Sequence, residues 1–255
     1  RCAQLVYKEH VEPSHLLVLA YNRAVVVELR NRLNSLFSRL GMSRIANQLN
    51  VYTFHAMAKK CMGSKLNNIK TELWEGAFLN YLQNNENDFR AHMPQIEFVL
   101  VDEFQDITKT RLQSLLSIHN IFPDAKFFTI GDINQSIYGF DRVPKDQWGC
   151  KLPITPKEYA QALNPQPYYD QLYSTLNPIR LTMFTNYRSY QGILDKSKEF
   201  LPLGADVPKS ASSIMEYEPH EQYVYEYTDK QWFNELPSIV AWAEEQNEFS
   251  ATIED

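Results

Sequence analysis

The stretch IEFVLVDEFQD, residues 96–106, decides the fold of this chain, because it is an apolar run that ends in two adjacent carboxylates, Asp102 and Glu103. A second apolar run, residues 127–130, ends in the block GDINQSIYGF. A site for magnesium and a triphosphate requires an oxygen ligand for the metal and a base for a water molecule. The two carboxylates can supply both. The second block adds a carboxylate, an amide and two aromatic rings: Asp132, Gln135, Tyr138 and Phe140.

Four short apolar runs of this kind predict a parallel sheet whose strands are buried on both faces. They are LLVLAYN (16–22), VYTFH (51–55), FVLVDE (98–103) and FFTIGD (127–132). The spacing of apolar residues predicts helices between them, at 24–40, 71–84 and 110–121, and Gly41 is a natural stop for the first. Alternating strands and helices indicate an α/β domain that binds its ligands at the carboxyl ends of the strands.

The sequence changes in character after Phe140. Residues 143–178 hold six prolines and several tyrosines, which predict loops and short helices. A strand is predicted at 181–184, ending in TNYRS, and a helix at 192–200. The alternating YVYEYTD at 223–229 predicts another strand, and a helix near 236–246 follows, with Pro237 in its first turn or at a kink.

Composition excludes several classes of protein. The net charge of −6 argues against a protein that coats nucleic acid through a broad basic face, whereas 13% aromatic residues leave open single-strand binding in a narrow groove. No run approaches the roughly 20 apolar residues of a membrane span, and the first ten residues lack the apolar segment of a secretory signal. Three distant cysteines, Cys2, Cys61 and Cys150, predict reduced thiols in an intracellular protein.

The blocks VDEFQD, GDINQSIYGF and NYRS, in this order, resemble ATPase motifs of UvrD/Rep-type superfamily 1 DNA helicases. LLVLAYNRA and YTFHAMA resemble that family's TFTNKAA and TFHS segments. The resemblance covers roughly residues 1–200 and continues faintly beyond. It implies a RecA-like parallel sheet flanked by helices, of the P-loop NTPase type, over residues 1–142. A connection or insertion at 143–178 and the start of a second RecA-like domain at 179–255 would follow.

The resemblance also implies ATP and Mg²⁺ as cofactors and assigns a role to each matching residue. Asp102 would hold Mg²⁺ and Glu103 would activate the attacking water. Asp132 and Gln135 would bind the nucleotide, Gln135 by contacting its γ-phosphate. The path of single-stranded DNA would be lined by Tyr21, Asn22, Thr53, Phe54, His55, Tyr138 and Phe140.

The NYRS block would complete the nucleotide site. Tyr187 would stack on the adenine, and Arg188 would neutralise charge on the γ-phosphate, as an arginine finger does. Closure of two RecA-like domains on ATP and their reopening after hydrolysis would then move the protein along the strand.

The chain departs from the family pattern at two places. The phosphate loop G-x-x-x-x-G-K-[ST] is absent, and we expect that the chain begins just past it and ends within the second motor domain. The chain alone is therefore expected to bind ATP poorly and not to hydrolyse it. In addition, Asp141 stands where relatives commonly have an Arg that meets the DNA backbone, and Arg142 is the candidate substitute.

Each assignment has a structural alternative. Asp102 and Glu103 would equally suit the start of the following helix, since acids favour helix N-termini. Gln135 is otherwise a loop amide, and Arg188 a surface ion pair. Tyr187, Tyr138 and Phe140 are otherwise core residues, and His55 is nearly as well explained as a structural histidine. The same doubt holds for Tyr21 and Asn22.

The sequence thus predicts the motor core of an ATP-dependent DNA helicase or translocase that acts on single-stranded DNA or DNA junctions. The resemblance implies a location in the cytoplasm with the nucleoid, or in the nucleus. Two alternatives stay open: a relative that binds single strands without hydrolysing ATP, and a motor subunit of a helicase–nuclease complex with a nuclease or repair partner. A phosphate loop encoded upstream of Arg1 would exclude the first, and a nuclease domain beyond Asp255 would favour the second.

Overall fold

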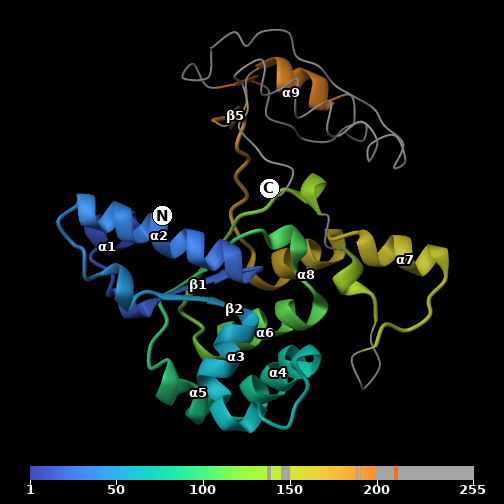
Figure 1. Ribbon diagram of the computed structural model, residues 1–255, viewed down its shortest axis with the longest axis horizontal. Helices are drawn as coiled ribbons and strands as arrows, with labels where there is room; N and C mark the ends of the chain where they lie inside the picture. The colour runs from blue at the N-terminus through green and yellow to red at the C-terminus, as the bar shows by residue number, and fades with distance from the viewer. Residues whose placement is uncertain (137–138, 145–149, 188, 190, 199–209, 212–255) are drawn as a thin grey trace, which may run out of the picture. The chain divides into compact units, whose positions relative to one another are not determined.

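The computed structural model of the chain describes residues 1–136, 139–144, 150–187, 189, 191–198 and 210–211 (Figure 1). Contacts group the chain into two compact units, Arg1–Arg180 and Leu181–Asp255. The first unit therefore includes the Pro- and Tyr-rich stretch 143–178. The domain boundaries expected after residues 142 and 178 stay a prediction.

The first unit is built on one parallel sheet with the strand order β2-β1-β3-β4. Adjacent strands pair in register at their carboxyl ends, with Leu19 opposite Val101 and Val101 opposite Thr129. The predicted α/β class and the parallel sheet are confirmed, and the arrangement is consistent with a RecA-like fold. The strands are β1 (Leu16–Ala20), β2 (Asn50–Thr53), β3 (Phe98–Val101) and β4 (Lys126–Thr129).

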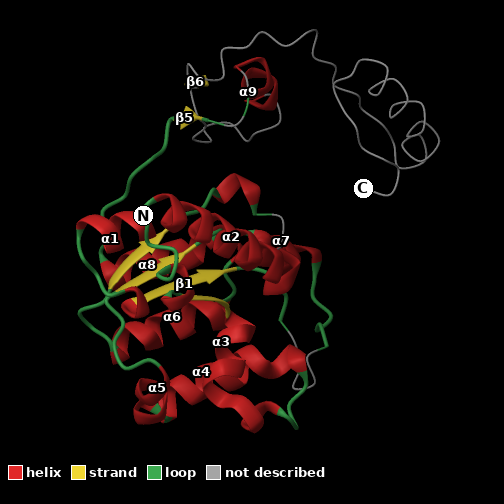
Figure 2. Ribbon diagram, turned by 60° about the vertical axis from the view of Figure 1, so that its left-hand side comes forward, coloured by secondary structure: helices red, strands yellow, loops and turns green. Residues whose placement is uncertain are grey.

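Helices cover both faces of this sheet, because successive side chains of a strand point to opposite faces. Leu16, Val18 and Ala20 of β1 pack with α1 (Cys2–Lys8) and α2 (Arg23–Arg39). Leu17 and Leu19 face the second core, which is formed with helices on the other side (Figure 2). Those helices are α3 (Phe54–Met62), α4 (Trp74–Asn84), α5 (Glu86–His92), α6 (Lys109–Ile121) and α8 (Gln166–Leu176).

The helices predicted at 24–40, 71–84 and 110–121 are confirmed in type, although a short 3₁₀ turn starts the second. Gly41 has a φ of +74°, the left-handed conformation that glycine adopts without steric cost, and it ends α2 as expected. The remaining turns are η1 (Pro13–His15), η2 (Ala46–Gln48), η3 (Gly63–Leu66), η4 (Thr71–Leu73), η5 (Phe104–Asp106), η6 (Ile133–Gln135) and η7 (Gly139–Arg142).

Two expectations about strands were wrong. β4 is not buried on both faces: Phe128 is 39% exposed, because α1 and α2 pack on the other strands and leave this face of β4 uncovered. Residues 181–184 form no strand, since Leu181 and Met183 are exposed and no described core covers them. The strand begins only at β5 (Thr185–Asn186), which pairs in parallel with β6 (Ser210–Ala211).

The stretch 143–178 contains short helices, as predicted. A capping box formed by Thr155 and Glu158 starts α7 (Pro156–Leu163), and Leu172 of α8 is buried in the core of the first unit. In the second unit α9 (Gln191–Lys198) confirms the predicted helix as far as the chain is described. The strand at 223–229 and the helix near 236–246 with Pro237 lie outside the described residues. Within the described part of the chain, no helix is long and apolar enough to cross a membrane.

Candidate functional site

The four strands of the first unit all end at one edge of the sheet, because they are parallel and adjacent. This edge collects the residues that follow each strand, from Tyr21 after β1 to Asp132 after β4. Backbone hydrogen bonds continue the sheet past its strands: Asp102 N–H donates to Leu19 O at 3.0 Å, and Phe104 N–H donates to Ile130 O at 2.9 Å. Most of the predicted site residues are therefore brought together by topology alone.

Asp102 and Glu103 lie at this edge, where Glu103 precedes η5 as its N-cap residue but its side chain makes no capping hydrogen bond. Asp102 is partly buried and accepts a hydrogen bond from Glu103 N–H at 3.1 Å. Burial, and then the negative charge of Glu103, raise the pKa of Asp102 above its ordinary value. Glu103 makes no capping hydrogen bond and adopts φ 51° and ψ 49°, a left-handed conformation that costs a non-glycine residue about 1 kcal/mol. The capping alternative is not supported, because the helix that follows is capped by Thr108.

Gln105 is a buried residue of the site that the sequence analysis did not single out. Its amide nitrogen Nε2 donates to Glu103 Oε2 at 2.7 Å, and its Oε1 accepts from Asp132 N–H at 3.1 Å. The side chain thus joins the turn after β3 to the turn after β4. The available signal was weak, a polar amide in a turn between Phe104 and Asp106, and only its burial at 2% exposure reveals the role.

Asp132 and Gln135 form the second half of the acidic edge. Asp132 accepts from Asn134 N–H at 3.0 Å, which starts η6, and its other oxygen accepts from Gln135 Nε2 at 2.9 Å. Gln135 is exposed. The amide of Gln135 therefore lies in the turn after β4, which Gln105 connects to Glu103, and so at the same edge of the sheet.

Arg142 corrects an expectation, since it is not available as a contact for a DNA backbone. The side chain is buried and donates inward to main-chain carbonyls, to Ile107 O at 3.0 Å, to Leu163 O at 2.9 Å and to Gln105 O. It also donates to Ser136 Oγ at 2.9 Å. Arg142 therefore holds the turn after β3, the turn after β4 and the end of α7 together.

The residues predicted to line a nucleic-acid path fall into two groups. Asn22 and Thr53 cap α2 and α3, accepting from Val25 N–H at 2.9 Å and from Ala56 N–H at 3.1 Å. Phe54 is only 4% exposed, so its ring departs from the expectation of a face on which bases stack. These three side chains build the edge rather than project from it.

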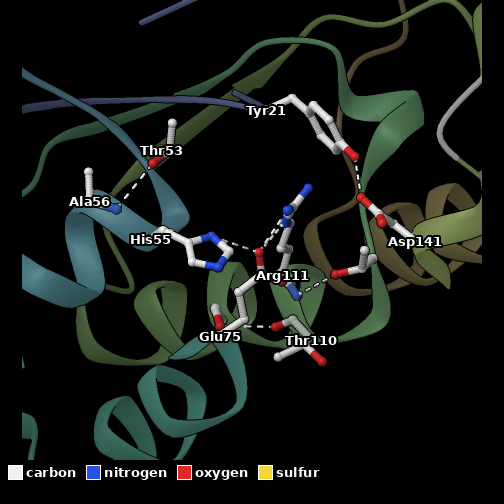
Figure 3. Close-up of polar contacts among 10 residues, drawn as sticks. Tyr21, Thr53, His55, Ala56, Glu75, Thr110, Arg111 and Asp141 are labelled. Carbon is white, nitrogen blue, oxygen red and sulfur yellow. Dashed lines mark hydrogen bonds and ion pairs between the residues drawn. The ribbon is translucent and has the colours of Figure 1, made fainter. Parts of the chain in front are cut away.

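The second group is more accessible. Tyr21 is half-buried and donates its hydroxyl hydrogen bond to Asp141, and the pKa of Tyr21 is raised, chiefly by burial and then by that bond (Figure 3). Phe140 is 39% exposed, with Lys151 Nζ 5.0 Å from its ring centre. His55 is partly buried, with Nδ1 3.2 Å from Glu75 Oε1. Asp141 thus binds the hydroxyl of Tyr21.

The candidate nucleotide residues of the second unit are only partly described. Tyr187 is 65% exposed, which excludes the core alternative within the described residues. Arg188 lies outside the described residues, as does Tyr138 of the first unit, which was predicted to line the nucleic-acid path. The roles assigned to these three residues stay predictions.

The donor set at the edge fits a magnesium ion that takes most of its ligands from elsewhere. Within the described ranges, no three His, Cys, Asp or Glu side chains gather closely enough to hold a metal ion by themselves. Mg²⁺ commonly takes one or two carboxylates and completes its shell from water and phosphate. Partial burial and the negative charge of Glu103 disfavour the ionised form of Asp102. A bound cation would offset both effects.

Fold and site together define an α/β protein whose acidic edge lies at the carboxyl ends of a parallel sheet. The family model described as the UvrD/REP helicase N-terminal domain matches residues 1–76 and 74–143, which is more than half of the chain. The chain belongs to this UvrD-type helicase family, as the ordered motifs predicted. No curated protein sequence matches the chain.

Proposed function

We propose that this chain is part of the motor core of an ATP-dependent DNA helicase or translocase, which couples Mg-ATP hydrolysis to movement along single-stranded DNA. One observation carries the proposal. In a chain of the UvrD/REP helicase family, Asp102 and Glu103 share an edge with Asp132 and Gln135 and are tied to it through Gln105.

The residues of the first unit divide the chemistry between them. Glu103, held through its Oε2 by Gln105, is the group that would accept the proton of the attacking water. Asp102 would hold Mg²⁺, which when bound offsets negative charge on the phosphates of the nucleotide. Gln135, whose amide donates to Asp132, would sense the γ-phosphate from the neighbouring turn.

The proposed strand contact lies along the same edge, nearer to β1 and β2. Tyr21 and His55 are partly exposed there, and Phe140 follows in the chain after the turn of β4. Stacking on aromatic faces is worth about 1–3 kcal/mol per base and does not require a basic surface. A narrow aromatic contact therefore agrees with the net charge of −6 better than a broad electrostatic one.

The test replaces the proposed base in the full-length protein. Glu103→Gln is expected to lower DNA-stimulated ATP turnover by at least about 10²-fold while ATP binding is retained, because the amide keeps the shape but takes up no proton. Glu97→Gln is the matched control, since this carboxylate directly precedes β3 at its opposite end. Normal turnover by Glu103→Gln would refute the assigned base.

A second candidate function is single-strand binding without hydrolysis. It stays open because stacking of bases on aromatic side chains needs no nucleotide site. The two functions differ in full-length protein under saturating single-stranded DNA: a motor hydrolyses ATP, whereas the binding protein holds DNA with an affinity that ATP does not change.

A further inference from the structure

Arg111 is a buried cation beneath the part of the edge formed by β1 and β2. It lies in the first turn of α6 and is 8% exposed. Its charge is paired with Glu75 of α4, whose Oε1 accepts from Nε at 2.9 Å and from Nη2 at 2.7 Å. Two hydrogen bonds to one carboxylate oxygen fix the plane of the guanidinium group.

That plane lies near two aromatic rings from different strands. The guanidinium carbon of Arg111 is 4.6 Å from the ring centre of Tyr21, after β1, and 5.7 Å from that of Phe54, after β2. An arginine within about 6 Å of an aromatic ring is attracted to it, and more strongly when both are shielded from water. Arg111 thus contacts the rings that follow two neighbouring strands, β1 and β2.

The same cluster reaches the accessible residues of the edge. Glu75 Oε1, which holds Arg111, also lies 3.2 Å from His55 Nδ1, and the hydroxyl of Tyr21 donates to Asp141 (Figure 3). Arg111 itself is too buried to meet a ligand, whereas Tyr21 and His55 are partly exposed. An effect of Arg111 on a ligand would therefore pass through its neighbours.

We propose that Arg111, held by Glu75, is a positioning residue that fixes the Tyr21 ring against the start of α3, so that the edge offers single-stranded DNA a preformed stacking face. The proposal rests on the proposed function for its ligand. The contact between Arg111 and Tyr21 does not depend on the proposed function. Two measurements separate these parts.

The first measurement needs no DNA. 3-Fluorotyrosine is placed at position 21 of the 255-residue chain, and its ¹⁹F resonance is recorded with Arg111→Gln. We expect the resonance to move and sharpen, because the ring loses the cation that packs on it. Arg90→Gln is the matched control: Arg90 also pairs with a glutamate, Glu86, and lies 4.6 Å from the Phe122 ring centre, at the other end of α6. An unmoved resonance in Arg111→Gln, or an equal shift in both variants, overturns the proposal.

The second measurement is the anisotropy of a fluorescent oligo(dT) over a range of salt concentrations. Arg111→Gln is expected to weaken binding about three- to tenfold while the slope of log Kd against log salt stays unchanged. A slope smaller by about 0.7 would mean that Arg111 contacts a phosphate directly, and it would overturn the positioning role. The double variant Glu75→Gln/Arg111→Gln guards against misfolding, since it leaves no partly buried carboxylate without its arginine.

Failure of the proposed function is distinguishable from failure of this inference. If the unchanged full-length protein does not bind oligo(dT), the strand contact is wrong, and the fluorine resonance still decides whether Arg111 holds Tyr21. If both variants bind as the unchanged chain does, Arg111 has no positioning role.

Discussion

Gly131, which directly precedes Asp132 and lies two residues past the end of β4, has no room for a side chain. A Cβ atom placed there would lie 2.7 Å from Gln105 Oε1, 2.7 Å from Tyr169 Oη and 3.0 Å from the main-chain nitrogen of Gln105. Gln105 is buried and its oxygen is bound to Asp132 N–H, so it cannot move aside without losing that hydrogen bond. Gly131→Ala should therefore separate the turns after β3 and β4.

The expected magnitude follows from two opposing effects. Overpacking of this kind costs about 1–3 kcal/mol. Replacing glycine by alanine also restricts the unfolded chain, which stabilises the folded state by about 0.4–1 kcal/mol. The net loss in the free energy of unfolding is thus about 0.5–2 kcal/mol. With an m-value of about 2 kcal/mol/M, the urea midpoint falls by about 0.3–1 M.

Gly76→Ala is the matched control for this experiment. Gly76 lies inside α4, and a Cβ atom there would meet nothing within 4 Å. The same substitution should raise the free energy of unfolding by about 0.5–1 kcal/mol, because alanine favours a helix interior. Urea unfolding followed by far-ultraviolet circular dichroism measures both variants. A Gly131→Ala midpoint at or above that of the unchanged chain, with Gly76→Ala stabilised, would refute the close contact with Gln105.

Two further variants test the electrostatics and the buried polar network of the first unit. Asp102→Asn should become more stable relative to the unchanged chain as the pH rises from below 3.8 to about 7. The reason is that the pKa of Asp102 is raised, so the folded state favours its ionised form less than the unfolded state does. Urea midpoints of both proteins across this pH range measure the trend, and a difference that does not change with pH contradicts it. Arg142→Met should lower the free energy of unfolding by roughly 3 kcal/mol, because the carbonyls of Gln105, Ile107 and Leu163 lose a buried donor. A loss below about 1 kcal/mol in the same urea assay would contradict this, and would show that water replaces the guanidinium group.

Much of the fold and the outline of the site were predictable because they depend on local pattern. Short apolar runs ending in Asp102 and Asp132 predicted strands, and apolar spacing predicted α2, α4 and α6. Parallel strands end at one edge, so the polar residues after them had to meet there. The prediction failed where a neighbour was required: β4 was expected to be buried on both faces, but no described helix covers Phe128.

The residues that join the edge together were not predictable in this way. Gln105, Arg111 and Arg142 are polar residues in turns or a helix, and sequence spacing places none of them opposite its partner. Arg142 was interpreted as a substitute for a contact with the DNA backbone, and the structure buries it against four main-chain carbonyls. Phe54 was interpreted as a stacking ring, and the structure buries it near Arg111.

The sequence by itself determined the order of strands and helices along the chain, the acidic residues at the strand ends and the family to which those motifs belong. Only the tertiary structure decided which polar side chains are buried and what they bind. The physical reason is that the periodicity of apolar residues can be read over a few neighbouring residues, and that parallel strands bring the residues after them to one edge of the sheet. The burial of Gln105, Arg111 and Arg142, in contrast, depends on packing between segments that lie far apart in the chain.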